Sequence, residues 1–145
     1  KNIIRITADC PLVDIKLIEK FIKKYYAGNY NYASNTMIPT YPDGMDIEIF
    51  KFTSLEKAWK NAKSSFEKEH VTPYLKKKKL NVLNFRNRIN QKGIRITLDH
   101  KDDFELIKRI FNHFKPNIYF GLKEIIELRK KFPGWFDINR KYNLK

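Results

Sequence analysis

Cysteine is almost absent from this sequence: Cys10 is the only one among 145 residues. A single cysteine excludes a disulfide within the chain, and it cannot hold a metal ion without other ligands. We expect Cys10 to be a small, partly buried residue and not a reactive thiol. This cysteine usage agrees with a reducing, cytoplasmic location.

Long apolar runs are missing as well. No stretch approaches the roughly 20 apolar residues that a membrane-spanning helix needs, so we expect no membrane partner. The first residues follow a strand pattern and not that of a signal peptide. The 11 Phe and 8 Tyr are spread along the chain, a content that disordered segments lack. The sequence therefore predicts that residues 1–145 belong to one domain with a single core.

Acidic residues are few beside the basic ones: 16 Asp and Glu stand against 30 Lys and Arg, a net charge of +14. Such an excess is typical of nucleic-acid binders, and it also suits an enzyme that binds a nucleoside triphosphate. A basic nucleic-acid-binding module would interleave exposed aromatics with its basic residues. Most aromatics here fall on the apolar stripes of helices instead, so we disfavour nucleic acid as the partner.

Strand and helix patterns alternate along the chain, which predicts an α/β fold. Asp14 can cap the first helix, and Thr53 to Glu56 has the pattern of a capping box. The expected strands cover 3–6, 30–34, 46–52, 80–85 and 94–98, and the expected helices cover 14–26, 53–63, 69–79, 101–114 and 122–131. No hairpin supplies a neighbour for the first strand. We therefore expect its partners to be parallel strands of βα units that precede Lys1.

Two expected strands are each followed directly by an aspartate, Asp9 and Asp99. Ligands of open α/β sheets bind outside the carboxyl ends of the strands, so parallel neighbours would bring both carboxylates to one edge. Magnesium needs one or two carboxylates and takes its other ligands from water and substrate phosphates. The pattern alone also fits two ordinary helix caps or strand-end residues.

Six short strings, in order, resemble those of a known family. RITADCPLVD, at Arg5 to Asp14, is similar to a signature of the spore-coat polysaccharide cytidylyltransferase family, which is related to the synthetases that activate sialic acid and ketodeoxyoctonate. The other strings are NYASNT at 31–36, YPDGMDIEIF at 41–50, LEKAW at 55–59, EHVTPYL at 69–75 and RITLDHKDDFELIKRIF at 95–111. Their order and spacing hold over nearly the whole chain, which makes the resemblance specific.

The resemblance implies a nucleotide-diphosphosugar-transferase-like fold, a three-layer α/β/α sandwich. It also implies Mg²⁺-dependent transfer of a cytidylyl group from CTP to a sugar or sugar acid, giving a CMP-sugar for polysaccharide or glycan synthesis. The family's two metal carboxylates fall on Asp9 and Asp99, which are the expected catalytic residues. A homodimer is a candidate assembly, because relatives form dimers.

Further site residues follow from the matched strings. Four of them would form a loop that binds the sugar acceptor: Tyr41, Gly44, Asp46 and Glu48. The alternative is a tight turn that leads into a strand, with Gly44 present for its permissive backbone.

Three more residues are candidates for substrate binding. Asn35 and Thr36 follow a short strand and would face the same edge of the sheet. His70 could orient a substrate or act as a base near neutral pH, or it could instead cap the start of a helix.

The chain also departs from the family pattern. Ala8 replaces the usual Gly beside Asp9, and His100-Lys101 replaces a residue-Pro pair. Gly121 stands at a helix start where Ser is usual, and Gly is acceptable there. The family's nucleotide loop, rich in Arg, Ser, Gly and Lys, has no counterpart. We therefore expect the N-terminal nucleotide-binding units to be missing and the chain as given to bind CTP poorly. A non-catalytic assembly domain is a further alternative.

Overall fold

Four strands form one mixed sheet in the computed structural model, which describes residues 1–77 and 81–143. The strands are β1 (Asn2–Arg5), β2 (Tyr32–Ser34), β3 (Glu48–Lys51) and β4 (Val82–Asn84), and their order in the sheet is β1-β3-β2-β4. β3 runs antiparallel to both of its neighbours, whereas β2 and β4 are parallel. β1 thus has one antiparallel neighbour, β3, and stands at an edge of the described sheet, so the expectation of parallel partners from units that precede Lys1 stays a prediction for its other side.

The reversed direction of β3 brings several loops to one edge of the sheet. Arg5 and Ser34 both lie opposite Glu48, and Ser34 pairs with Asn84. The carboxyl ends of β1, β2 and β4 thus meet the amino end of β3. We call this edge, with residues 7–9, 35–36 and 43–46, the rim.

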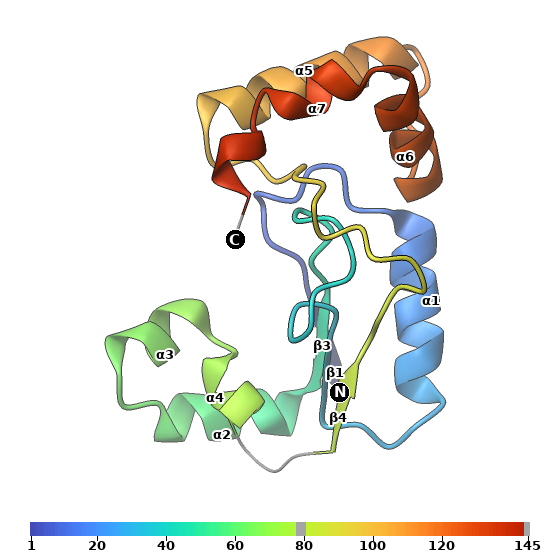
Figure 1. Ribbon diagram of the computed structural model, residues 1–145. Helices are drawn as coiled ribbons and strands as arrows, with labels where there is room; N and C mark the ends of the chain where they lie inside the picture. Colours follow the sequence, from blue (N-terminus) through green and yellow to red (C-terminus); the bar gives the residue numbers. More distant parts are fainter. Residues whose placement is uncertain (78–80, 144–145) are drawn as a thin grey trace.

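Helices cover both faces of the sheet, which confirms the α/β/α sandwich. Figure 1 shows α1 (Ile15–Tyr26) on one side and α2 (Phe52–Asn61), α3 (Ser65–His70) and α4 (Pro73–Lys77) on the other. Beyond the rim lie α5 (Lys101–Phe114), α6 (Leu122–Lys131), α7 (Pro133–Asp137) and a 3-10 turn, Arg140–Tyr142.

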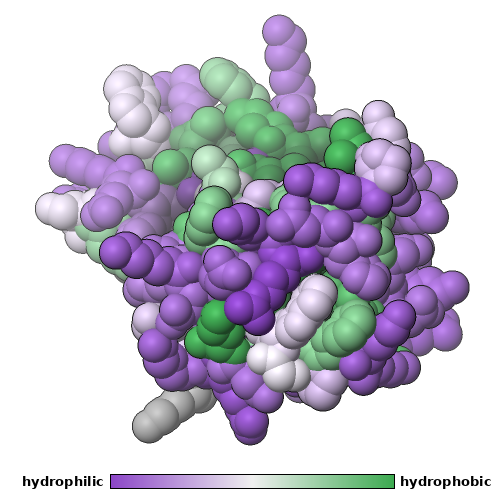
Figure 2. Space-filling view, turned by 90° about the horizontal axis from the view of Figure 1, so that it is seen from above, coloured by the Kyte–Doolittle hydropathy of each residue, from purple (hydrophilic) through white to green (hydrophobic). Residues whose placement is uncertain are grey.

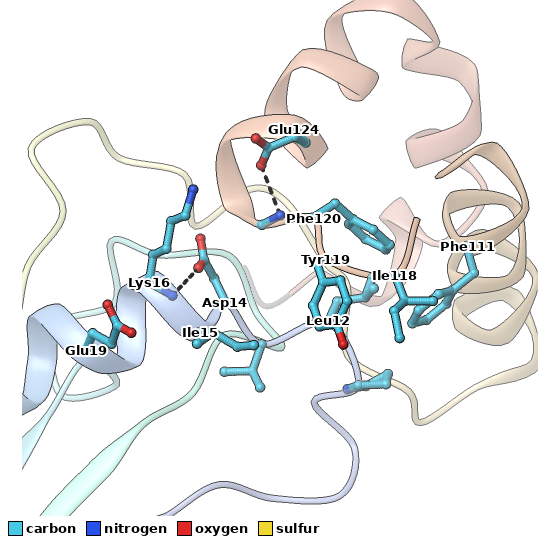
Figure 3. Close-up of a pocket in the computed structure, with 13 residues that line it drawn as sticks. Leu12, Asp14, Ile15, Lys16, Glu19, Phe111, Ile118, Tyr119, Phe120 and Glu124 are labelled. Carbon is cyan, nitrogen blue, oxygen red and sulfur yellow. Dashed lines mark hydrogen bonds between the residues drawn. The ribbon is translucent and has the colours of Figure 1, made fainter. Parts of the chain in front are cut away.

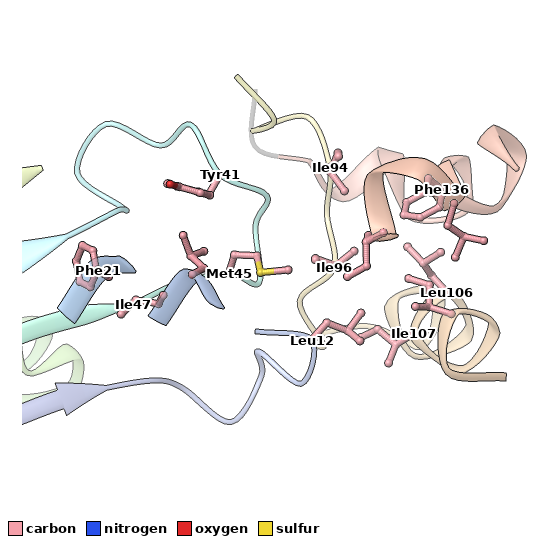
Figure 4. Close-up of a cluster of buried hydrophobic side chains, with 14 of the residues drawn as sticks. Leu12, Phe21, Tyr41, Met45, Ile47, Ile94, Ile96, Leu106, Ile107 and Phe136 are labelled. Atoms are coloured by element: carbon pink, nitrogen blue, oxygen red, sulfur yellow. The ribbon is translucent and has the colours of Figure 1, made fainter. Parts of the chain in front are cut away.

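Two apolar clusters hold these layers together. The larger one begins with Phe21 of α1 and Ile47, continues through Met45 and Ile96, and ends on α5 and α7 (Figure 4). The smaller one packs α2 and α4 on the other face of the sheet and contains Tyr32, Phe50, Ala58 and Leu75. β3 is therefore buried on both faces, so its environment differs little from that of a central strand in a larger sheet.

The expected strand at 94–98 is an extended segment and not a member of the sheet. It forms one isolated bridge, between Asp43 and Arg95. Ile94 and Ile96 are nevertheless fully buried, because the segment lies between the rim and α5. Its apolar pattern reports burial, and burial alone does not decide whether a segment joins a ladder.

The helix starts differ from the predicted ones on the α2–α4 side. The predicted capping box at Thr53 is absent, since α2 begins at Phe52 without a side-chain cap. A capping box forms instead between Ser64 and Glu67, at the start of α3. The predicted helix over 69–79 is replaced by α3 and α4, which a turn at Val71 separates. Its last two residues, and the predicted strand start at Leu80, lie outside the described residues.

The three long amphipathic helices are confirmed. Asp14 caps α1 by accepting hydrogen bonds from the amides of Lys16 and Leu17, and α5 and α6 match their predicted ranges. Seen from above, the surface is mainly hydrophilic with hydrophobic residues gathered in patches (Figure 2). Across residues 1–77 and 81–143, none of the helices has both the length and the apolar character needed to cross a bilayer.

Candidate functional site

Two pockets open at the rim and share Thr36 and Asp46. The first, which we call the α4 pocket, has a volume of about 340 Å³ and is lined by Arg5, Thr7, Thr36, Asp46, Glu48, Phe66, His70, Thr72, Pro73 and Lys76. The second, the loop pocket, has a volume of about 210 Å³ and is lined by Asn35, Thr36, Pro39, Tyr41, Pro42, Asp43, Asp46, Lys92 and Asn143. The structure thus brings six predicted site residues together: Asn35, Thr36, Tyr41, Asp46, Glu48 and His70.

Glu48 lies at the base of the α4 pocket with both carboxylate oxygens occupied. Oε1 accepts hydrogen bonds from the Tyr32 hydroxyl at 2.5 Å and the Thr72 hydroxyl at 2.8 Å. Oε2 accepts one from the Arg5 guanidinium, and the Lys76 ammonium lies 3.5 Å from Oε1. Burial alone would raise the pKa of Glu48, but these donors outweigh it and hold that pKa below its ordinary value.

Asp46 has the opposite environment two residues earlier. Its carboxylate accepts no hydrogen bond from the described part of the chain. Burial raises the pKa of Asp46 to about 6, and nearby carboxylates, first Asp43 and then Asp9, add to the increase. A carboxyl group with such a pKa can hold or release a proton near neutral pH.

Asp9 follows β1 and has a half-buried side chain. Its carboxylate accepts only a weak contact from the Cys10 thiol, at 3.7 Å. Its backbone carbonyl accepts hydrogen bonds from the amide of Leu98 at 2.8 Å and the hydroxyl of Thr97 at 3.1 Å. The chain segments that carry Asp9 and Asp99 are therefore direct neighbours, although residues 94–98 do not form the predicted parallel strand of the sheet.

Asp99 is paired with an arginine. Its Oδ2 lies 2.7 Å from the guanidinium of buried Arg95, which also binds Asp43 at 2.8 Å and Asp103 at 2.8 Å. Asp103 is fully buried and accepts further hydrogen bonds from the Asn139 amide and two backbone amides. Burial would raise the pKa of Asp103, but the Arg95 and Asn139 donors lower it to about 2.

Gly44 has a positive φ of 101°. A Cβ atom at this position would lie 2.5 Å from the backbone carbon of Ile96. Glycine is therefore required both by its backbone conformation and by the close approach of the neighbouring segment. Gly44 shapes the turn before Asp46 and has no side chain to offer a substrate.

Asn35 and Tyr41 fix the loop that leads to Asp46. The buried Asn35 amide donates to the carbonyl of Met45 at 2.6 Å, and its oxygen accepts from the Ile47 amide at 2.9 Å. Tyr41 stacks on Phe85 with ring centroids 5.8 Å apart. The Thr36 hydroxyl bonds to Ser34 at 2.7 Å and accepts from Lys76 at 3.3 Å. These contacts make the rim a preformed surface.

His70 ends α3 and does not begin a helix, so the predicted alternative of a helix-start cap is wrong. Its exposed ring packs on Phe66, with centroids 4.5 Å apart. Both rings line the α4 pocket, where the imidazole can donate or accept a hydrogen bond.

The rim fits a magnesium ion in part. Among the described residues, no group of three or more His, Cys, Asp or Glu is arranged to hold a metal by itself. Magnesium needs only one or two carboxylates when phosphates and water supply the rest. The carboxylate of Asp9 is free for this role, whereas that of Asp99 is shared with Arg95.

The sequence reasoning missed the residues that organise the rim. Arg5 and Arg95 each interrupt an apolar run, as Ile-Arg-Ile, and bind buried carboxylates. A charge inside an apolar run is a signal of such pairing, because buried charges need partners. Thr72 and Lys76 carry no comparable signal.

Cys10 is buried, as expected. Burial raises the pKa of its thiol to about 11, so the reactive thiolate is scarce at neutral pH.

A third pocket, of about 380 Å³, lies between the amino ends of α1 and α6 (Figure 3). Asp14 joins these helices, since its Oδ2 also accepts from the Leu122 amide at 2.9 Å. Gly121 allows this contact, because a Cβ there would lie 2.5 Å from Asp14 Oδ2. None of the predicted site residues lines this pocket. It lies where Asp14 connects the starts of α1 and α6.

Comparison with known proteins agrees with this arrangement. The family model described as cytidylyltransferase matches residues 1–136. A cytidylyltransferase structure from Leptospira borgpetersenii superimposes with a TM-score of 0.88 at 29% identity, covering 93% of this chain and 58% of that one.

Two curated proteins are also similar. An uncharacterised protein of Methanocaldococcus jannaschii is 38% identical over 141 residues, which are 94% of this chain and 56% of that protein. The spore coat polysaccharide biosynthesis protein SpsF of Bacillus subtilis is 26% identical over 141 residues, covering 90% and 55%. The chain thus spans a little over half the length of these relatives. The match over residues 1–136, and a fold that gathers the matched strings at one rim, show that the chain belongs to the cytidylyltransferase family.

Proposed function

We propose that the protein transfers a cytidylyl group from CTP to a sugar or sugar acid and releases pyrophosphate. The observation that carries this proposal is the rim itself, where Asp46 lines a polar pocket and Asp9 is near enough to help raise the pKa of Asp46. Nucleotidyl transfer is supported by the family.

In the proposed reaction a hydroxyl of the acceptor attacks the α-phosphate, and the bond to pyrophosphate breaks. Magnesium, when bound, would offset charge on the phosphates. Asp9 and Asp99 are the residues that we propose to hold it. Arg95 would keep Asp99 oriented, because it binds that carboxylate at 2.7 Å.

The α4 pocket is the proposed acceptor site. Its hydroxyls, its two cations and the His70 imidazole are fixed donors and acceptors of the kind that orient a polyol. Asp46 lies at its edge and in the loop pocket. With a pKa of about 6, Asp46 is suited to accept the proton of the attacking hydroxyl.

The test is CTP-dependent pyrophosphate release by the protein encoded by the complete reading frame, with a panel of sugars and sugar acids. Asp9→Asn should lower the rate by about 100-fold or more. Asp137→Asn, an exposed carboxylate on α7 away from the rim, is the matched control and should keep the wild-type rate. The proposal is contradicted if no acceptor in the panel supports pyrophosphate release by the wild type. It is also contradicted if the two variants have equal rates.

A further inference from the structure

The buried carboxylate of Glu48 reaches across the sheet to the connection between α3 and α4. Its partner there is Thr72, which is 2% exposed and donates from its hydroxyl at 2.8 Å. Arg5 of β1 and Tyr32 of β2 also donate to Glu48, and the Lys76 ammonium of α4 forms an ion pair with it at 3.5 Å. Hydrogen bonds to a buried charge are among the stronger ones in proteins. Glu48 therefore fastens the α3–α4 connection to the sheet.

That connection contains an unusual backbone conformation. Val71 has φ 65° and ψ −50°, the one positive φ of a non-glycine residue in the described ranges 1–77 and 81–143. The amide of Thr72 donates to the carbonyl of His70 at 2.6 Å, which closes a three-residue γ-turn. A β-branched residue rarely takes positive φ, and this form of γ-turn is strained. Such a conformation persists where its surroundings hold it in place.

The strained turn sets the position of the pocket wall. His70 directly precedes Val71, and Lys76 lies on α4, whose first turn closes on the carbonyl of Thr72. Both His70 and Lys76 line the α4 pocket. If the turn relaxed toward negative φ, α3 and α4 would change their relative direction, and the two side chains would separate.

We propose that Glu48 is a positioning residue of the acceptor site: its carboxylate holds the strained turn at Val71 and thereby places His70 and Lys76 on the pocket wall. The inference rests on the proposed function, in which the α4 pocket binds the acceptor. It differs from a role of Glu48 as a substrate ligand, since both of its oxygens are already occupied by protein donors.

A double-mutant cycle tests this assignment. Glu48→Gln should raise the KM for the acceptor by about tenfold or more, with a smaller change in kcat, because the amide cannot accept at both positions. Val71→Gly should change that KM by less than about threefold, since glycine takes positive φ readily. In the Glu48→Gln background, Val71→Gly should recover most of the loss. Val13→Gly, a half-buried valine with ordinary φ, is the control and should recover none.

Hydrogen exchange gives a readout that does not depend on activity. Glu48→Gln should lower the protection of the Thr72 amide by about tenfold, and added Val71→Gly should restore it. If no acceptor is used by the wild type, the proposed function fails, and exchange still decides the role of Glu48. Unchanged protection of Thr72 in Glu48→Gln, or a KM loss that Val71→Gly does not reduce, overturns the proposal.

Discussion

Asp46 precedes β3 by two residues and Glu48 is the first residue of that strand, yet their carboxylates have opposite environments. Glu48 accepts hydrogen bonds from Arg5, Tyr32 and Thr72, and its pKa is lowered. Asp46 accepts none from the described residues, and burial raises its pKa to about 6. Burial disfavours the charged form of both groups, so the presence of donors decides the outcome. Glu48 therefore stabilises the fold, whereas Asp46 costs stability and is free to act on a substrate.

The largest expected effect is the loss of stability on removing the structural carboxylate. Glu48→Gln should lower the free energy of unfolding by about 3 kcal/mol, because it leaves buried donors poorly paired. Urea denaturation at pH 7 measures this. Glu56→Gln, an exposed glutamate paired with Lys60, is the matched control and should leave the stability close to that of the wild type. If Glu48→Gln lowers the stability no more than Glu56→Gln does, Glu48 is not a structural carboxylate and its contrast with Asp46 is lost.

A second variant, Gly44→Ala, should displace the Asp46 carboxylate without changing Asp46 itself. Gly44→Ala forces an alanine to φ 101° and against the backbone of Ile96, so we expect a loss of about 2 kcal/mol. The loop before Asp46 should move, with a large fall in kcat/KM. Gly93→Ala is the control, because a Cβ there meets nothing within 4 Å. Wild-type activity in Gly44→Ala would show that the turn does not position Asp46.

The sign of the effect should reverse at Asp46 itself. Asp46→Asn should raise the free energy of unfolding at pH 7 by about 1–2 kcal/mol, since it removes a half-buried charge that accepts no hydrogen bond from the described residues. The same change should lower activity, as expected for a functional group that costs stability. Thermal melts together with pyrophosphate release check both parts. A melting temperature below that of the wild type contradicts the prediction.

The pH dependence of stability separates the two groups with smaller effects. The folded pKa of Asp46 is raised above its ordinary value, so its favourable contribution is present at low pH and is lost as pH rises from about 4 to 6. The folded pKa of Glu48 is lowered, so its contribution is present above pH 4.5 and is lost on acidification. The advantage of Asp46→Asn over the wild type should therefore grow between pH 4 and pH 6, and the deficit of Glu48→Gln should shrink below pH 4.5. Urea denaturation series across this pH range measure both trends.

Local signals in the sequence were sufficient for a large part of the fold. The apolar stripes and the Asp14 cap predict α1, and the same kind of stripe predicts α5 and α6. The matched strings predict the family. The segments that carry Asp9 and Asp99 are joined by a backbone hydrogen bond between Leu98 and Asp9, but not as the predicted parallel strands.

The parts that sequence reasoning missed depend on contacts between distant segments. The antiparallel pairing of β3 with β1 is not visible in the pattern of either strand. Both carboxylate oxygens of Glu48 accept hydrogen bonds from residues that are 16 to 43 positions away in the sequence. Nothing in the Thr72 or Lys76 region distinguishes those donors from ordinary helix residues. The roles of Glu48 and Asp46 therefore look equal in the sequence and differ in the structure.

The most direct test of this contrast is a single NMR titration of the side-chain carboxyl groups of Asp46 and Glu48. The structure predicts that Asp46 titrates near pH 6 and Glu48 below its ordinary value of 4.5. A Glu48 pKa at or above that of Asp46 would contradict the division between a structural carboxylate and a free one.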